Sequence, residues 1–557
     1  MTSRTFHDTF LDELARLDAY LSEVGGGAPE APQSSDPEVR RLLEATAFFS
    51  ARTQEMAYRG AFDAVSWLLA EQCDFLRRPL VARGLVQACD AGGWSSAIRL
   101  PQRTPLLVES AEGTVGQFAT AVSAVVAPLA VVDLRLERAP GERWLLLEVE
   151  APLGFAELEW LSLYVDVLGD RRRSLSLHRR LRWACRSARY WSVKTEPGSR
   201  RRRPELSELR ELPALDVRFG RRRGELGDDA PSALEAVRAH FQLPEQNLFL
   251  NVLLPAQRDD QRAWIALELE PEGPEFPCSK GAFRPNVLPI ENEVRAPSDP
   301  IVEDGRTTDH WVLPPAELSA PGFGDPASGY ELLEVKRVSE VHEKHEVTLL
   351  SSSIAEPERS YRLGWRSVDG KERPLLRLSA PGTPERPRRL RLNATWTQPG
   401  LDLRALSRLR LRPWRLALPH VELKPLPASA PFVPSPLSGD PEKLLDVAAL
   451  TNRSWLGRDE LVHLLKLLGA GAHVWGKCVD AVESVRWREV TSSGAGAGTE
   501  LEVTLRARVL GDELEALQHD LSDRIQDVLN AWCDAPVRVL LETIALRAPL
   551  RLAEGGA

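Results

Sequence analysis

The tightest group of potentially catalytic side chains is the run His342-Glu343-Lys344-His345-Glu346. A zinc-protease helix carries two histidines four residues apart, so that both imidazoles reach one metal beside the glutamate. Here the histidines are three residues apart, and residues 347–350 have the composition of a strand. In a strand, a spacing of three sends the two side chains to opposite faces. We therefore predict no metal site, and a metal-dependent hydrolase that uses His342 and His345 stands as the alternative from the enzyme class.

Other catalytic patterns are missing from the sequence. A serine nucleophile of the hydrolase type needs a Gly-x-Ser-x-Gly elbow between a strand and a helix, and no such pentapeptide occurs. The Gly-Ala tract at 494–498 joins two expected strands and lacks the Lys-Ser/Thr pair that holds phosphate and magnesium, so we expect a hairpin connection there. Paired carboxylates such as Glu148 and Glu150 are common in any acidic protein of this size. We expect no catalytic residue, no cofactor and no metal, and hence no enzyme.

The charge pattern does not favour nucleic-acid binding. The formal net charge is -9, and arginines gather at 171–173, 200–203 and 221–223. A nucleic-acid reader needs a basic domain with a recognisable fold, whereas these arginine groups alternate with acidic stretches. We predict that they serve solvated loops or protein–protein contacts.

Cysteine usage and hydropathy indicate a cytoplasmic protein. The six cysteines are scattered without a Cys-x-x-Cys pair, which is typical of a reduced chain with buried thiols. No segment reaches the ~18 uninterrupted apolar residues of a membrane helix. The first residues carry charges among their apolar side chains and do not form a signal peptide. We expect no membrane insertion.

The N-terminal region has the apolar spacing of amphipathic helices. A first stripe runs up to the glycines at 25–27 and consists of Phe6, Phe10, Leu14, Leu17 and Leu21. A second helix begins near Ser35 and Glu38, which have the spacing of a capping box, with Pro37 at an early position. Its apolar stripe consists of Val39, Leu42, Leu43, Thr46 and Phe49. Such stripes pack either inside the chain or against partner helices, and the spacing fits both. The first stripe is our candidate partner-binding surface.

The middle of the chain is predicted to be rich in short strands separated by turns. Strands are expected at 104–108, 125–137, 144–149, 161–168, 264–269, 331–335, 375–378 and 390–394. Helices are expected at 179–189 and 233–241. Proline is dense between about 255 and 440, which favours β-rich modules with long connections.

The C-terminal region has the clearest pattern. Residues 500–509 alternate strictly between apolar and polar side chains, as in a half-buried strand. A strand at 482–490 precedes it, and a helix from Leu514 to Trp532 and a strand at 537–546 follow it. With helices at 444–450 and 460–468, the order is α-β-β-α-β, with helices packed on one face of a sheet.

The sequence thus predicts a multidomain α+β protein. Its expected parts are an N-terminal helical region at 1–90, a β-rich domain with helices at 91–255, a Pro-rich β domain at 256–435 and an α+β domain at 436–557.

Several segments of the chain carry short blocks of characteristic residues. Residues 36–52 carry an Asp-Pro-x-Val-x-Arg-Leu-Leu-Glu-Ala-like run that ends in Phe-Phe-Ser-Ala-Arg. Residues 100–106 and 118–129 combine a turn with Phe-x-Thr and Pro-Leu segments, and residues 240–249 form an aromatic Pro-Glu block. Residues 283–292 carry Phe-x-x-Asn-x-x-Pro-x-x-Asn. Together these blocks resemble the TssF (ImpG/VasA) family, the wedge protein of the type VI secretion baseplate, and they occur in family order over most of the chain.

The resemblance implies a structural subunit that works by binding and change of shape. Family members pair as two copies with one TssG subunit, and the resulting wedges connect to the hub, to the sheath initiator and to TssK. The expected partners are therefore a TssG-like subunit, a second copy of this chain, and TssK-like, TssE-like and hub components, in a baseplate docked at the inner membrane. A stand-alone scaffold or adaptor from an unrelated β-rich family is the remaining alternative.

Overall fold

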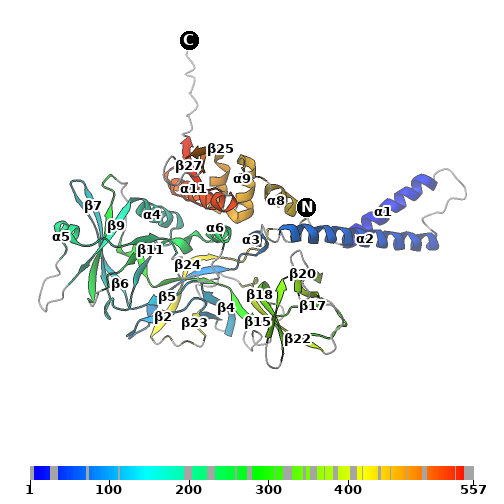
Figure 1. Ribbon diagram of the computed structural model, residues 1–557, viewed down its shortest axis with the longest axis horizontal. Coiled ribbons are helices and arrows are strands. Elements are labelled where there is room, and N and C mark those ends of the chain that lie inside the picture. The colour runs from blue at the N-terminus through cyan, green and yellow to red at the C-terminus, as the bar shows by residue number, and fades with distance from the viewer. Residues whose placement is uncertain are drawn as a thin grey trace, which may run out of the picture. The chain divides into compact units, whose positions relative to one another are not determined.

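A computed structural model of the chain (Figure 1) describes residues 6–25, 36–69, 74–110, 113–193, 203–221, 232–256, 260–272, 279–307, 309–315, 318, 329–342, 346–351, 360–368, 371–379, 387–401, 410–414, 416, 418, 420–436, 441–451, 453, 455–471, 473–491, 499–533 and 535–544. The chain forms two compact units. One consists of Met1–Arg77 with Ser435–Leu456, and the other of Arg78–Pro434 with Gly457–Ala557.

The smaller unit is helical. Its elements are α1 (Phe6–Gly25), α2 (Pro37–Leu69), α3 (Asp74–Arg77) and α8 (Pro441–Thr451). Figure 1 draws α1 and α2 in blue as a hairpin, and α8 lies beside α2. The carboxylate of Asp36 accepts a hydrogen bond of 2.9 Å from the backbone N–H of Glu38, so Asp36 caps α2 and Pro37 is its first residue. Ser35, the predicted cap, lies outside the described residues.

The larger unit contains a closed barrel with the strand order β1-β14-β4-β3-β23-β24. Its strands are β1 (Arg83–Asp90), β3 (Pro105–Ser110), β4 (Gly113–Thr120), β14 (Val287–Glu291), β23 (Arg410–Pro413) and β24 (Val421–Ala430). Buried apolar side chains such as Val86, Phe118 and Ile290 fill its interior. The barrel joins strands that are far apart in the sequence, and the predicted domain boundaries stay predictions.

Two further sheets lie in the larger unit. One sheet has the order β6-β7-β12-β9, with β6 (Ala130–Ala139), β7 (Glu142–Glu150), β9 (Cys185–Ser192) and β12 (Arg262–Leu269). The other has the order β10-β11-β8-β13, with β8 (Trp160–Val165), β10 (Val217–Phe219), β11 (Phe249–Leu253) and β13 (Phe283–Pro285). A short pair is formed by β2 (Ile98–Leu100) and β5 (Ala124–Val126). The chain between these strands also forms α4 (Arg171–Ala184), α5 (Leu206–Glu211) and α6 (Ala233–Gln242).

The helix predicted over 179–189 is wrong in its bounds. Asp170 caps α4 by accepting hydrogen bonds from the backbone N–H groups of Arg172 and Arg173, so the helix begins eight residues earlier than expected. It ends at Ala184, and the following residues form β9, which pairs with β12. Long-range pairing decided the conformation of these residues against their helical spacing.

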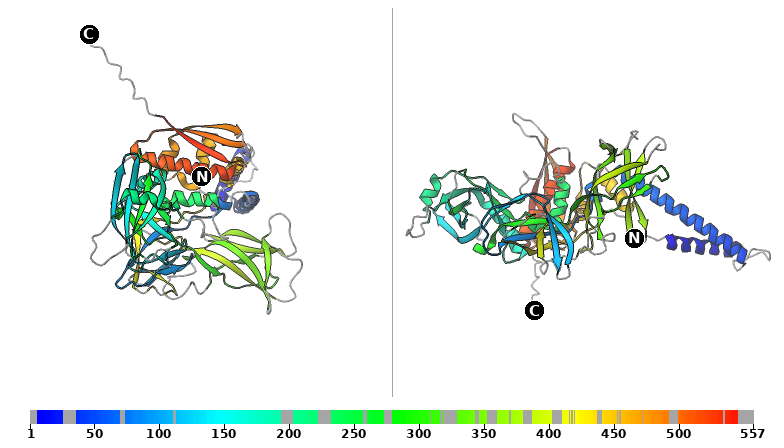
Figure 2. Two further views of the ribbon diagram at one scale, coloured as in Figure 1. Left: turned by 60° about the vertical axis from the view of Figure 1, so that its left-hand side comes forward. Right: turned by 90° about the horizontal axis from the view of Figure 1, so that it is seen from below.

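Residues 294–397 form a β-module that the chain inserts between β14 and β23, and we call it the insert. Its described strands build an eight-stranded sheet. They are β15 (Val294–Pro297), β16 (Ile301–Glu303), β17 (Asp309–Trp311), β18 (Glu331–Val341), β19 (Glu346–Ser351), β20 (Ser360–Val368), β21 (Lys371–Ser379) and β22 (Arg388–Thr397). Figure 2 shows them as a green to yellow-green sheet. Buried apolar side chains, Trp396 among them, form a core of their own.

The C-terminal α-β-β-α-β order is confirmed. The elements are α9 (Arg458–Leu465), a π-helical segment Lys466–Ala470, α10 (His473–Asp480), β25 (Val482–Thr491), β26 (Thr499–Arg508), α11 (Asp512–Trp532) and β27 (Val537–Ile544). On β26 four residues of the predicted apolar face, Leu501, Val503, Leu505 and Ala507, are buried. The fifth, Val509, is exposed, because the strand ends at Arg508. The sequence missed α10, which follows Gly469 at φ 104. The tract 494–498 lies outside the described residues. The α+β fold class is confirmed.

Candidate partner-binding surface

The predicted stripe on α1 holds the helical hairpin together. Leu14 is buried and packs with Leu43 and Ala47 of α2. Phe10, Leu17 and Leu21 pack against the same cluster and are partly buried. Phe6 contacts the ring of Phe48 edge to face, with the ring centroids 5.4 Å apart. All five residues therefore lie on the α2 side of α1, and their binding to a partner stays a prediction.

Polar pairs fix the register of the hairpin. Arg40 of α2 donates to Asp18 of α1 at 3.1 Å, and the Ser50 hydroxyl donates to Glu13 at 2.9 Å. The hydrogen bonds from Gln54 and Ser50 lower the pKa of the Glu13 carboxyl. Because Asp18 pairs with the earlier α2 residue and Glu13 with the later one, the two helices run antiparallel.

The stripe predicted on α2 divides into two faces. Val39 and Leu43 turn toward α1, whereas Leu42 and Phe49 are 70% and 66% exposed. Met56, at 66%, continues the exposed row. Leu42, Phe49 and Met56 are seven residues apart, and we call them the α2 outer row. Since each residue turns a helix by ~100°, neighbours such as Leu42 and Leu43 face different directions.

An apolar row at seven-residue spacing is the pattern of a helix that packs on another helix. Single exposed apolar residues are ordinary on a protein surface, but this hairpin carries several. Besides the α2 outer row, the exposed large side chains of the hairpin are Leu11, Tyr20, Phe48 and Tyr58. Exposed apolar groups in this density mark interaction sites. The sequence pattern did not single out Met56 as part of an apolar row, although Met56 lies seven residues after Phe49.

Of the histidine pair His342 and His345, the structure describes only His342. His342 follows the last residue of β18, and its Nε2 lies 3.3 Å from a carboxylate oxygen of Glu340. His345 lies outside the described residues. Within the described part of the chain, no group of three or more His, Cys, Asp or Glu side chains could hold a metal ion.

A buried His–Asp pair has the geometry of a general base with its orienting carboxylate, but its surroundings are structural. His240 Nε2 lies 2.6 Å from Asp520 Oδ2, and the Asn247 side-chain amide lies 2.9 Å from His240 Nδ1. Burial raises the pKa of the Asp520 carboxyl, but His240 and nearby arginines outweigh burial and hold that pKa well below its usual range. The ring of Trp475 lies 5.7 Å from that of His240. His240 Nε2 thus joins α6 to Asp520 of α11, while Nδ1 is engaged by Asn247 just after α6.

Several described arginines of the basic groups make ion pairs within the chain. Arg171 pairs with buried Glu245. Arg221 lies 3.6 Å from Glu291 and donates to the backbone carbonyl of Ala121 at 2.7 Å. Of the groups at 200–203 and 221–223, only Arg203 and Arg221 lie within the described residues. Internal pairing accounts for these charges without a nucleic acid.

The two asparagines of the Phe-x-x-Asn-x-x-Pro-x-x-Asn block fasten the barrel. Asn286 adopts a positive φ of 58, and its side chain exchanges two hydrogen bonds with the backbone of Ala127. Asn292 is fully buried at the end of β14 and accepts or donates three side-chain hydrogen bonds. This block therefore sets the backbone geometry of the barrel strands that it joins.

The sequence of residues 27–372, more than half of the chain, matches the family model described as "Type VI secretion system, TssF". The chain belongs to the TssF family. This membership confirms the family that the sequence blocks resembled. No curated protein gives a significant match.

Solved structures share the fold of this TssF-family chain. A chain of a type VI secretion TssK-TssF-TssG baseplate subcomplex, solved by cryo-electron microscopy, superposes with a TM-score of 0.68 at 18% identity, covering 91% of this chain and 96% of that chain. A chain of a type VI secretion baseplate complex superposes with a TM-score of 0.53 at 15% identity, covering 98% and 97% of the two chains. Nearly the whole length of each chain is matched.

No described helix of the chain is both long enough and apolar enough to span a bilayer.

Proposed function

We propose that this TssF-family chain is a structural subunit of a type VI secretion baseplate. It assembles with a TssG-like subunit and a second copy of itself into a wedge, and the wedge binds TssK-like, TssE-like and hub components. The observation that carries the proposal is the family match over residues 27–372. The fold shared with chains of two baseplate structures supports it.

The proposal assigns the protein a binding role and no catalysis. The candidate catalytic side chains serve other ends, since His240 and Asp520 join two helices and His342 contacts Glu340. The protein works in the cytoplasm, in a baseplate docked at the inner membrane, and transmits a rearrangement of that baseplate to sheath contraction.

The helical hairpin supplies the partner-binding surface in this proposal. The α1 stripe of Phe6, Phe10, Leu14, Leu17 and Leu21 shapes the hairpin, which presents the α2 outer row to a helix of a partner subunit. Burying three large apolar side chains contributes about 1.5–3 kcal/mol each. That free energy is gained only when an apolar surface of the partner covers these side chains, because they otherwise remain in water.

The test is native mass spectrometry of the chain co-expressed with the TssG-like protein encoded beside it. We expect a complex of two copies of this chain with one TssG-like subunit. The double variant Phe49→Asp/Met56→Asp should lose the complex by more than tenfold in affinity, because two charges enter an apolar interface. Its helix content should equal that of the wild type, since both positions are exposed.

A matched control separates this surface from exposed apolar residues in general. Leu168 is 89% exposed in the larger unit, so Leu168→Asp should leave assembly intact. Unchanged assembly of the Phe49→Asp/Met56→Asp variant would contradict the role of the α2 outer row. A monomer under every condition would contradict the wedge proposal itself.

A further inference from the structure

The chain leaves the barrel for the insert and returns to the barrel at one buried point. The chain enters the insert after Asn292 and leaves it at Thr397 and Gln398. Asn292 Oδ1 accepts hydrogen bonds from the Thr397 hydroxyl at 2.8 Å and from the Gln398 backbone N–H at 2.6 Å. Its Nδ2 donates to the carbonyl of Gln117 in β4 at 2.6 Å. One side chain thus ties both crossings of the insert to the barrel.

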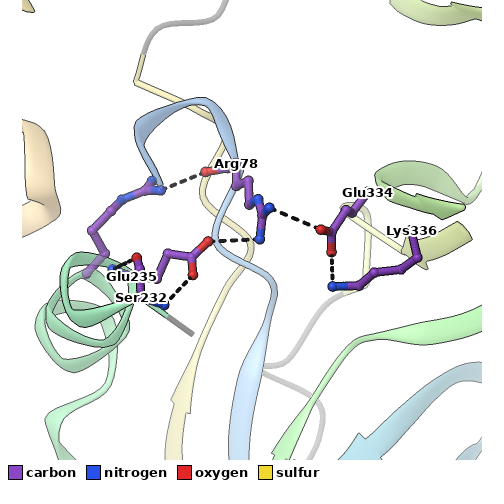
Figure 3. Close-up of polar contacts among 6 residues, drawn as sticks. Arg78, Ser232, Glu235, Glu334 and Lys336 are labelled. Atoms are coloured by element: carbon purple, nitrogen blue, oxygen red, sulfur yellow. Dashed lines mark hydrogen bonds and ion pairs between the residues drawn. The ribbon is translucent and has the colours of Figure 1, made fainter. Parts of the chain in front are cut away.

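A second tie between the insert and the rest of the unit is ionic. Arg78 is the first residue of the larger unit. Its Nη1 lies 3.0 Å from Glu235 of α6, and its Nη2 lies 3.0 Å from Glu334 of β18 in the insert (Figure 3). The guanidinium therefore bridges two carboxylates from different modules. Its own backbone carbonyl accepts a hydrogen bond of 2.7 Å from Arg238, which holds the residue against α6.

The two ties differ in their access to water. Asn292, Thr397 and Gln398 are all buried. The side chains of Arg78, Glu235 and Glu334 are 35%, 20% and 23% exposed, so salt and polar partners can reach this ion pair. A neutral buried network is costly to break because its groups lose all partners. A half-exposed ion pair opens at a far smaller cost.

Each side of the ionic tie also keeps a partner when it opens. Glu334 lies 2.6 Å from Lys336 Nζ. Glu235 accepts a hydrogen bond of 2.8 Å from the backbone N–H of Ser232 as part of the capping box of α6, and it can retain Arg78 (Figure 3). Separation of Arg78 from Glu334 therefore leaves neither carboxylate without a hydrogen-bond or ionic partner.

We propose that Asn292 and Arg78 form a hinge and a latch that control the orientation of the insert on the barrel. Asn292 is the hinge, which keeps the two crossings together, and the Arg78–Glu334 ion pair is the latch. Arg78 is a positioning residue, since it is fixed against α6 and at the same time holds β18 through Glu334. Opening the latch lets the insert pivot as a folded module.

Hydrogen–deuterium exchange of the full chain tests this device. In Glu334→Gln, the junction peptides around residues 290–296 and 396–401 should exchange about three- to tenfold faster than in the wild type, because pivoting opens their hydrogen bonds more often. Peptides of β22 within 390–394 should exchange at the wild-type rate, since the insert stays folded. Arg78→Gln should give the same pattern, and the double variant should add nothing further.

Two controls distinguish a latch from a general loss of stability. Asp309→Asn removes an ion pair with Arg377 inside the insert and should leave the junction peptides unchanged. Raising salt from about 0.05 M to about 0.5 M should speed junction exchange in the wild type and not in Glu334→Gln, because the screened ion pair is already absent there.

Wild-type exchange at the junction in both variants would overturn the proposal. An equal increase throughout the insert, including β20 and β21, would also overturn it, because that result means unfolding and not pivoting. The salt experiment compares only the wild type with Glu334→Gln, so it applies even if Arg78→Gln does not fold.

Discussion

The helical hairpin and the barrel junction use their side chains in opposite ways. The hairpin buries one apolar stripe between α1 and α2 and leaves a second row, Leu42, Phe49 and Met56, in water. The junction buries even its polar groups, and Asn292 satisfies three of them at once. The first region leaves apolar side chains in water, whereas the second buries its polar groups and ties them by hydrogen bonds. The proposed partner surface lies in the first region.

The junction depends on the buried hydrogen bonds of the Asn292 side chain, and removing that side chain should destabilise the protein. Asn292→Ala removes partners from the Gln117 carbonyl, the Thr397 hydroxyl and the Gln398 N–H, all of them buried. We expect a loss of about 3 kcal/mol or more in the free energy of unfolding, at about 1–3 kcal/mol for each orphaned group. Urea unfolding monitored by tryptophan fluorescence measures it. Asn530→Ala, which removes one hydrogen bond from an exposed residue, is the control and should cost under half as much.

The two faces of the hairpin can be separated by a pair of variants. Leu14→Ala should lower the stability of the hairpin by about 2–3 kcal/mol, because a buried leucine leaves a cavity. Phe49→Ala should change it by less than about 0.5 kcal/mol, since the ring is 66% exposed. Circular dichroism during thermal unfolding compares the two. Equal losses would show that Phe49 serves the hairpin and not a partner.

The stability of the junction should also depend on pH, to a smaller extent. Burial and the neighbouring Glu291 carboxylate raise the pKa of Glu293, which follows Asn292, to about 7 from an ordinary 4.5. The folded protein therefore holds this proton more tightly than the unfolded chain does. The stabilisation is fully present below pH 4.5 and is lost as the pH rises through 7.

Glu293→Gln should remove that dependence. At pH 8 the variant should be more stable than the wild type by on the order of 1 kcal/mol, and near pH 4 the two should be alike. Urea titrations across this range measure the difference. The same pH slope in both proteins would mean that Glu293 is not the group that titrates.

Local sequence patterns predicted the elements whose apolar residues follow a clear strand or helix period. The alternation on β26 identified its buried face, and the Leu514–Trp532 helix was expected to within two residues of α11. The boundary between α4 and β9 was wrong, because pairing with β12 outweighs the helical spacing of residues 185–189. Helix α10 was not predicted, because it is short and follows a turn at Gly469.

The sequence also predicted the α1 stripe, but not which side of α2 it would cover. Val39, Leu42, Leu43 and Phe49 all looked like one apolar stripe, and packing of α1 divided them. Helical spacing states which residues share a face and not what that face meets.

The sequence by itself determined the family and the α+β class of this chain, and it predicted the stripe on its first helix. These properties rest on local order: apolar spacing, turn residues and blocks in a fixed sequence. The tertiary structure decided which polar groups meet. Arg78 lies 157 residues from Glu235 and 256 from Glu334, and Asn292 lies 175 from Gln117. No local pattern specifies such partners, because only the closing of the barrel and the insertion of a module into it bring them within hydrogen-bonding distance.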